Sequence, residues 1–169
     1  LRAACKPIKN ISASETQELI IAMFKSLKKA QGVGLAAPQI RLNKQLFLAS
    51  PEGNAKAPYT TIQDGLVVFN PRLEPLGKKT ETDWEGCLSI PGFRAPVKRF
   101  SKIKLHYTNF LGEQASEIYE GFDARVIQHE YDHLQGVLYL DHLENLDHLM
   151  TENYFNKLVE EHVNTQESN

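Results

Sequence analysis

Apolar and polar residues recur along the chain with two different periods, and these periods predict where helices and strands lie. A stripe with helical spacing, three and four positions apart, is formed by Ile20, Met23, Phe24 and Leu27. Ser14 opens a capping-box sequence before this stripe, and Gly32 and Gly34 follow it. We therefore expect a first helix over about residues 14–31, with the stripe facing the core.

Strand-like patterns fill the middle of the chain, from about residue 45 to residue 121. Short apolar runs, or apolar residues that alternate with polar ones, occur at 45–49, 66–70, 78–83, 103–107 and 114–120. A hairpin turn is expected at 109–112. The stretch 51–65, which is rich in Pro, Gly, Asn and Ala, is expected to be an exposed loop.

Helical periodicity returns near the C-terminus. We expect a second helix over 124–135, capped by Asp123 and ended by Gly136, then a short strand at 137–140. A last helix is expected over 147–163, with one side formed by Met150, Tyr154 and Leu158. Because strands and helices are segregated along the chain, the predicted class is α+β: one domain over 1–169, with antiparallel or mixed β-sheets packed around the second helix.

Composition excludes several classes of protein. The chain has 169 residues, of which 41% are hydrophobic, so a disordered or collagen-like chain is not expected. The formal net charge of −2 gives no overall field that would recruit nucleic acid or an anionic membrane. No apolar run is long enough to span a bilayer, and no secretory signal is seen. Whether an import segment precedes Leu1 stays an open question.

Two histidines four residues apart form the first candidate site. On the predicted second helix, His129 and His133 would lie on one face, one above the other, and could bind one metal ion. Glu130 lies about 100° around the helix and could accept a proton from metal-bound water. The alternative is a surface helix with two unrelated histidines. Val126 and Ile127 argue instead for a buried helix.

The third metal ligand is better sought upstream than downstream. The extended H-E-x-x-H-x-x-G-x-x-H pattern requires histidine where the chain has Tyr139, and Glu152 lies in a polar helix without a companion motif. Upstream, Cys87 follows Gly86 between two strand-like segments, and a thiolate is stabilised by a metal. A small buried apolar side chain is the alternative reading of Cys87. Cys5 is the only other cysteine, so a reducing compartment is expected. A single disulfide between Cys5 and Cys87 stays an alternative.

Three segments together resemble the motifs of the peptide deformylase family. They are G-V-G-L-A-A-P-Q at 32–39, E-G-C-L-S at 85–89 and Q-H-E-Y-D-H at 128–133, and the resemblance extends over nearly the whole chain. It implies an enzyme that removes the formyl group from the N-terminal formyl-methionine of newly made polypeptides and releases formate. It also implies one Fe(II) per chain, replaceable by Zn(II), Ni(II) or Co(II), and a bacterial cytoplasmic location, or an organelle if an import segment is missing.

The resemblance also implies a role for each matched residue. Cys87, His129 and His133 would hold the metal, whose hydroxide would attack the formyl carbon. The Gln39 side chain and the backbone N–H of Leu88 would stabilise the oxyanion. Glu130 would take the proton of the water and pass it to the leaving amine. For Gln39, a solvated or backbone-bonding residue is the alternative.

Substrate contacts are implied as well. The family pairs the main chain of its substrate with Val33, Gly34 and Gly86 as an added strand. Val126, His129 and Phe122 would border the methionine pocket, although Val126 and Phe122 are equally read as plain core. Two other positions are left open by the sequence. Asp132 either orients a ligand or faces solvent, and Arg94 is expected near Glu85 by charge and family pattern.

The C-terminal tail departs from a feature of some bacterial members, in which a basic C-terminal helix helps docking on the ribosome. Residues 160–167 are acidic and polar here, which argues against that mode of ribosome association. The expected partners are nascent polypeptides, without direct nucleic-acid or membrane contact, and a monomer is favoured. Two other functions stay open: a zinc endopeptidase with a downstream third ligand, and a catalytically silent metal- or peptide-binding module.

Overall fold

The computed structural model describes residues 1–50 and 65–167, without the side chains of 162–167. The predicted loop at 51–65 therefore lies, apart from Gly65, outside the described residues. Two compact units are formed: one by Leu1–Glu81 with Arg99–Leu138, the other by Thr82–Lys98 with Tyr139–Asn169. None of the helices in the described ranges combines the length and apolar character that a bilayer crossing requires. The single domain stays a prediction.

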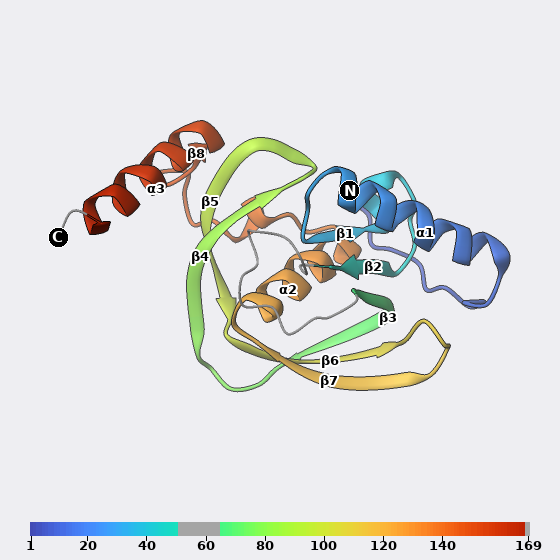
Figure 1. Cartoon of the computed structure of the whole chain (residues 1–169). Coiled ribbons are helices and arrows are strands. Elements are labelled where there is room, and N and C mark those ends of the chain that lie inside the picture. The colour runs from blue at the N-terminus through green and yellow to red at the C-terminus, as the bar shows by residue number, and fades with distance from the viewer. Residues whose placement is uncertain (51–64, 168–169) are drawn as a thin grey trace. The chain divides into compact units, whose positions relative to one another are not determined.

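The first unit contains a five-stranded sheet, two α-helices and a short 3-10 helix (Figure 1). Its elements are α1 Ser14–Lys29, β1 Gly34–Ala36, η1 Ala37–Ile40, β2 Leu46–Ala49, β3 Leu66–Pro75, β6 Lys102–Thr108, β7 Gln114–Glu120 and α2 Gly121–Gln135. The strand order is β1-β2-β3-β6-β7, and all neighbours are antiparallel. The N-terminal segment joins it through a bridge between Lys6 and Lys44.

Strand β2 is buried on both faces, which explains why its sequence is a continuous apolar run. Phe47 and Ala49 belong to a core cluster that includes Ile127 of α2, whereas Leu46 and Leu48 pack in a second cluster with Met23 of α1. Alternate side chains of a strand point to opposite faces. Helices α1 and α2 thus cover the two faces of the sheet at this strand, and α2 lies in the core of the unit.

The second unit contains the strands β4 Thr80–Cys87, β5 Ile90–Phe100 and β8 Met150–Thr151, in the order β4-β5-β8, although β4 begins and β5 ends in the first unit. It also contains η2 Tyr139–His142 and α3 Glu152–Glu167. Ala95, Val97 and Tyr139 form its small apolar core. The expected α+β class, with an N-terminal helix, a C-terminal helix and antiparallel sheets, is confirmed.

Several predicted boundaries are wrong, each for a local reason. Ser14 is not the cap of α1, because Ala13 holds that position and its carbonyl accepts from the N–H groups of Thr16 and Gln17. Asp123 is not the cap of α2. The helix begins at Gly121, two residues before Asp123, so Asp123 lies in its first turn. A carboxylate is still favourable there because it interacts with the positive end of the helix dipole. Gly136 ends α2 as predicted, in a left-handed conformation.

Two further predictions fail after α2. The apolar run at 137–140 is not a strand, since Tyr139 begins the 3-10 helix η2. The last helix starts at Glu152 instead of residue 147, because Met150 and Thr151 pair with β5 as strand β8. Tyr154 and Leu158 are consequently exposed and do not form a buried side of α3.

Candidate metal centre

Helix α2 carries both histidines on one face and keeps them close together. Their ring centroids are 5.0 Å apart, with the rings nearly perpendicular. His133 is only 1% exposed, and burial, together with the nearby His129, lowers its pKa to about 3. An imidazole that stays neutral at physiological pH is the form that binds a metal ion. His133 is therefore held in the form that can bind a metal ion, with His129 beside it.

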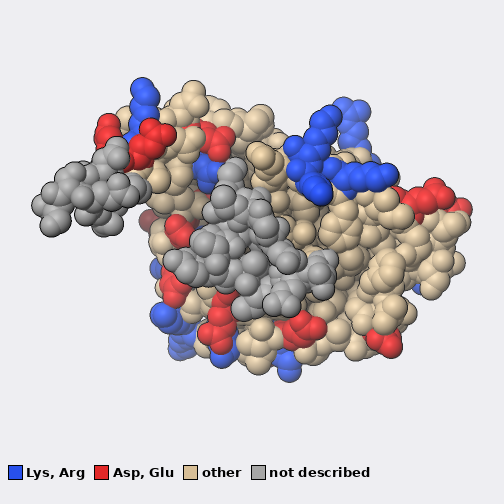
Figure 2. All heavy atoms as spheres, in the orientation of Figure 1, with Lys and Arg blue, Asp and Glu red and all other residues tan. Residues whose placement is uncertain are grey.

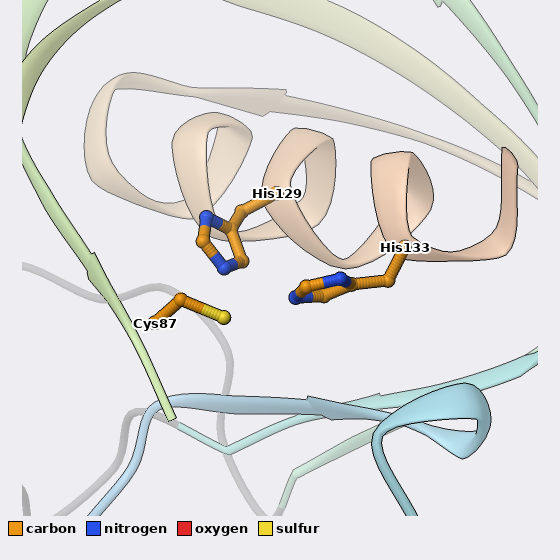
Figure 3. Close-up of side chains that lie close together, drawn as sticks. All are labelled: Cys87, His129 and His133. Atoms are coloured by element: carbon orange, nitrogen blue, oxygen red, sulfur yellow. The ribbon is translucent and has the colours of Figure 1, made fainter. Parts of the chain in front are cut away.

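Cys87 is the last residue of β4, and a turn leads from it into β5. The backbone N–H of Ser89 donates to the Cys87 Sγ atom at 3.4 Å, which helps to orient this side chain. Cys87, His129 and His133 point toward one another (Figure 3), and each offers a ligand atom within 4.8 Å of the others. Both cysteines are free, which excludes the disulfide between Cys5 and Cys87.

The three side chains fit a single metal ion. Sulfur and nitrogen ligands about 2.0–2.3 Å from a tetrahedral ion lie roughly 3.3–3.8 Å from one another. Separations up to 4.8 Å are thus closed by small side-chain movements around an ion. Two imidazoles and one thiolate also leave a fourth position of the tetrahedron for water or substrate. Zinc and first-row metals such as iron accept this donor set.

Glu130 is held in the interior, beside the glycine-rich segment that precedes η1. It is 3% exposed although it is a carboxylate. A Cβ atom built on Gly34 would lie 2.3 Å from Glu130 Oε1, 2.7 Å from Cδ and 2.8 Å from Cγ. Contacts that short do not occur between real atoms, so only a glycine fits opposite Glu130 while this side chain keeps its position. Gly34 thus allows the Glu130 carboxylate to lie directly on the backbone of β1.

Gln39 is oriented by a hydrogen bond to its own chain. The Ala36 N–H donates to Gln39 Oε1 at 2.7 Å. Because the oxygen of the amide accepts this bond, the Nε2 group is turned the other way and can donate. Gln39 is therefore backbone-bonded, as the alternative reading expected, and the bond leaves the oxyanion role chemically available. Leu88 lies in the turn after β4 with its side chain 45% exposed.

The remaining predicted substrate residues have different surroundings. Val126 is buried in the core cluster of the first unit, and Val33 and Phe122 are partly buried against that cluster. Gly86, in β4, has room for a Cβ, with Phe93 O nearest at 3.4 Å. The core reading of Val126 and Phe122 thus agrees with their packing, and their contact with a substrate stays a prediction.

Two side-chain connections near the histidines were not predicted from the sequence. Arg99 Nη1 contacts Asp132 Oδ2 at 2.5 Å, and the Arg99 side chain is only 4% exposed. Gln128 clamps the backbone of Phe100: its Oε1 accepts the Phe100 N–H at 3.1 Å and its Nε2 donates to the Phe100 carbonyl at 2.9 Å. Both fix the end of β5 to α2. Asp132 therefore forms an ion pair with the buried Arg99 and does not simply face solvent.

Arg94 has a partner other than the expected one. Its Nη2 donates to Glu152 Oε1 of α3 at 2.9 Å, and its guanidinium lies 5.1 Å from the ring centre of Phe155. The expected partner, Glu85, is 5% exposed. The charge of Arg94 therefore anchors α3 to β5 through Glu152, and the suggested pairing with Glu85 stays a prediction.

Comparison with known proteins gives one consistent result. Residues 1–158 match the family model for polypeptide deformylase. Peptide deformylase 1 of Xanthomonas campestris is 42% identical over 143 residues, which cover 83% of this chain and 82% of the relative. Peptide deformylase 2 of Nostoc is 35% identical over 161 residues, which cover 94% of this chain and 89% of the relative.

Solved structures agree with the sequence relatives. The peptide deformylase of Synechococcus elongatus in complex with actinonin has a TM-score of 0.76 at 38% identity, and the match covers 86% of this chain and 74% of that one. The Thermotoga maritima peptide deformylase also scores 0.76, at 33% identity, with 85% and 90% covered. By its sequence motifs, its fold and these relatives, the chain belongs to the polypeptide deformylase family.

Proposed function

We propose that this chain is a metal-dependent hydrolase that removes the formyl group from the N-terminal formyl-methionine of newly made polypeptides and releases formate. The observation that carries the proposal is the group of Cys87, His129 and His133, with the buried Glu130 on the same helix as the two histidines. Membership of the deformylase family supports the same reaction.

Cys87, His129 and His133 would hold one metal ion, which we propose to be Fe(II). A bound ion supplies a Lewis acid that makes water nucleophilic near neutral pH. Zn(II), Ni(II) and Co(II) accept the same imidazole and thiolate donors, so they are expected as substitutes. The low pKa of His133 supports this assignment, since a protonated imidazole could not bind the ion.

Glu130 would move the proton of the reaction. Its carboxylate would accept a proton from the attacking water and deliver it to the nitrogen of the methionine as the formyl C–N bond breaks. Close packing against Gly34 restricts where this carboxylate can lie. A base that is positioned in advance avoids the entropy cost of finding its partner in each turnover.

The oxyanion that forms on the formyl group would be stabilised by two N–H donors. Gln39 would donate through Nε2, because the Ala36 N–H already occupies its oxygen. The backbone N–H of Leu88 would be the second donor. Loss of one such donor typically reduces the rate by about a hundredfold or more, so both are expected to matter.

The substrate would bind as an extended peptide. Strand β1 is terminal in the order of the five-stranded sheet, and Gly34 and the adjacent Val33 offer backbone groups there. Gly86 would pair with the peptide, and Phe122 and Val126 would border the methionine side chain. A peptide deformylase of Acinetobacter baumannii, 31% identical with a TM-score of 0.77 over 85% of this chain and 90% of that one, has been solved with Met-Ala-Ser bound. This supports formyl-Met-Ala-Ser as test substrate.

Formate release from formyl-Met-Ala-Ser by anaerobically purified protein tests the proposal, with metal analysis of the same sample. We expect one metal ion per chain and formate in step with the Fe(II) content. Glu130→Ala should keep the metal and lose formate release. An iron-loaded protein without activity would refute the deformylase, and an active Glu130→Ala variant would refute the proton transfer. The natural substrates would be nascent polypeptides, and on this ground we propose the bacterial cytoplasm as the location, with an organelle as the alternative.

A further inference from the structure

The net charge of −2 hides a strong separation of charge along the chain. Residues 1–50 contain eight Lys and Arg but only two acidic residues, Glu15 and Glu18, which gives a formal charge of +6. The remaining residues contain 11 Lys and Arg and 19 Asp and Glu, a formal charge of −8. Asymmetry of this kind is typical of a chain with one surface for a polyanion.

The fold gathers part of the positive charge on one surface. Lys6 and Lys44 lie side by side in the bridge between the N-terminal segment and the start of β2, held by Gln45 N–H donating to the Lys6 carbonyl at 2.8 Å. Lys9 follows Lys6 by three residues and Arg41 precedes Lys44 by three, so along this parallel bridge they extend the positive charge in opposite directions, and all four residues are exposed. We call Lys6, Lys9, Arg41 and Lys44 the basic face.

The N-terminal segment is fixed in place by amide side chains. Asn70 brackets Ile8: its Oδ1 accepts the Ile8 N–H and its Nδ2 donates to the Ile8 carbonyl, both at 2.8 Å. Gln45 Nε2 donates to the Cys5 carbonyl at 3.2 Å. Because these bonds hold the backbone on both sides of Lys6, its charge is presented from a fixed main chain.

Within residues 1–50 and 65–161, whose side chains the structure describes, none of the ion pairs neutralises the basic face. Residues 1–14 and 19–50 contain no Asp or Glu. In the described parts of the chain, the ion pairs involve other cations. Helix α1, which shares an apolar cluster with Ile8, adds the exposed Lys25, Lys28 and Lys29. Figure 2 shows Lys and Arg side chains gathered over α1 and the N-terminus, at the upper right.

The composition of residues 1–46 indicates which part of a nucleic acid, base or phosphate, the basic face would contact. Phe24 is the only aromatic residue among the first 46, and it packs against the apolar cluster under α1. Without exposed aromatic rings, bases cannot be bound by stacking. Lysine and arginine on a fixed backbone instead contact phosphates, independently of base sequence.

We propose that the basic face binds the phosphate backbone of RNA. The choice of RNA over an anionic membrane rests on the proposed function, because a nascent polypeptide emerges from a particle built largely of RNA. The net charge alone argued against direct contact with nucleic acid, and the separation of charge reverses that argument. None of the four basic-face residues is one that we place in the metal centre, so the contact would place the enzyme near its substrate without changing the chemistry.

Two triple variants of the full chain test the proposal with equal net charge. Lys6→Gln, Lys9→Gln and Lys44→Gln remove three charges of the basic face, whereas Lys78→Gln, Lys98→Gln and Lys157→Gln remove three exposed charges elsewhere. Both change the formal charge from −2 to −5. Arg41 is kept, because it caps the 3-10 helix that carries Gln39. The probe is a fluorescent RNA hairpin of about 16 base pairs, followed by anisotropy.

The logarithm of RNA affinity falls linearly with the logarithm of salt concentration, and each lost phosphate contact makes this slope less steep by about 0.9. The basic-face variant should therefore lose about 2–3 in slope between roughly 50 and 200 mM salt, and at least tenfold in affinity at about 100 mM. The control variant should change the slope by less than about 1. Formate release from soluble formyl-Met-Ala-Ser should be the same in both variants.

Three outcomes would overturn the RNA surface: no binding by the unaltered chain at low salt, equal loss in both variants, or unchanged RNA binding by the basic-face variant. Vesicles that contain phosphatidylglycerol are the second probe. If the vesicles bind the unaltered chain but not the basic-face variant, and RNA binding is the same for both proteins, the partner is a membrane instead. The binding assay needs no turnover, so an inactive enzyme would refute the proposed reaction and leave this result standing.

Discussion

A single methyl group added at Gly34 should displace the carboxylate that we place in proton transfer. Gly34 lies in β1, and the Glu130 side chain lies directly over its Cα. Because the Glu130 side chain is almost fully buried, it has little room to move aside. Gly34→Ala therefore tests whether the backbone of β1 positions Glu130, without removing any atom of the catalytic group.

The size of the displacement follows from the distances. The new Cβ would lie 2.3 Å from Glu130 Oε1, and ordinary contact begins near 3.4 Å, so the oxygen must move by roughly 1 Å. Overpacking of this kind costs about 1–3 kcal/mol of stability. For a chain of this length that lowers the melting temperature by about 2–4 °C per kcal/mol. A catalytic group misplaced by about 1 Å can lose about a hundredfold in rate.

The assay compares kcat and KM for formate release by Gly34→Ala and by the unaltered protein, with metal content and melting temperature measured on the same samples. We expect kcat to fall about a hundredfold while the metal is retained. Gly112→Ala is the control, since its position in a hairpin turn has a positive φ and no atom within 4 Å of the new Cβ. It should lose about 1 kcal/mol of stability to backbone strain and keep its rate.

A double-mutant cycle with Glu130→Ala separates this mechanism from others. With the Glu130 side chain gone, the methyl group at Gly34 has space, so Gly34→Ala should then cost little stability and leave the residual rate unchanged. The coupling free energy should exceed about 1 kcal/mol, as for residues in direct contact. If Gly34→Ala has the same effect with and without the Glu130 side chain, or raises KM alone, the reasoning is refuted and Gly34 acts on the peptide instead.

Three other predictions follow from the metal centre. Cys87→Ser should lose most of the metal on dialysis, and retention would favour the endopeptidase arrangement with its ligand downstream. The stability of metal-free protein should fall as pH drops from about 6.5 toward 3, by up to about 1.4 kcal/mol per pH unit, because the fold keeps His133 neutral while the unfolded chain takes up the proton. Urea unfolding at several pH values measures this, and His133→Gln, which cannot titrate, should reduce the slope by the contribution of His133; equal slopes would contradict the assignment. Asp132→Asn should cost about 2 kcal/mol, below the roughly 3–5 of a fully buried pair, since it leaves buried Arg99 without that charge; unchanged urea unfolding would contradict it.

Elements set by local signals were the most predictable from the sequence. Helix α1 agrees with its predicted range to within two residues, although its cap does not, and α2 ends as predicted, because helical periodicity and a left-handed glycine act within a few residues. Strand β5 was not delimited, since Pro91 and Pro96 are typical of loops. It nevertheless pairs with β8, and that pairing depends on residues more than fifty positions away.

The candidate site shows the same division. The spacing of His129 and His133 predicts a ligand pair, and the motifs and the comparisons both identify the family, which is confirmed. The contact of Arg99 with Asp132 joins residues 33 positions apart, and charge alone did not select that partner. Gly34 was expected to follow the first helix and to pair with the substrate backbone, whereas the structure shows a reason for glycine there in the packing of Glu130.

The shortness of β1 has a consequence for how broadly such an enzyme can act. A strand at the end of a sheet is a template for any extended chain, including an aggregating one. With three residues, Gly34–Ala36, β1 offers only a few backbone hydrogen bonds, enough to register the first positions of a peptide and too few to hold a longer segment. A strand of this length would contact only the first residues of a substrate and would not distinguish the sequences that follow them. One enzyme could therefore process thousands of different proteins while presenting little surface for unwanted assembly.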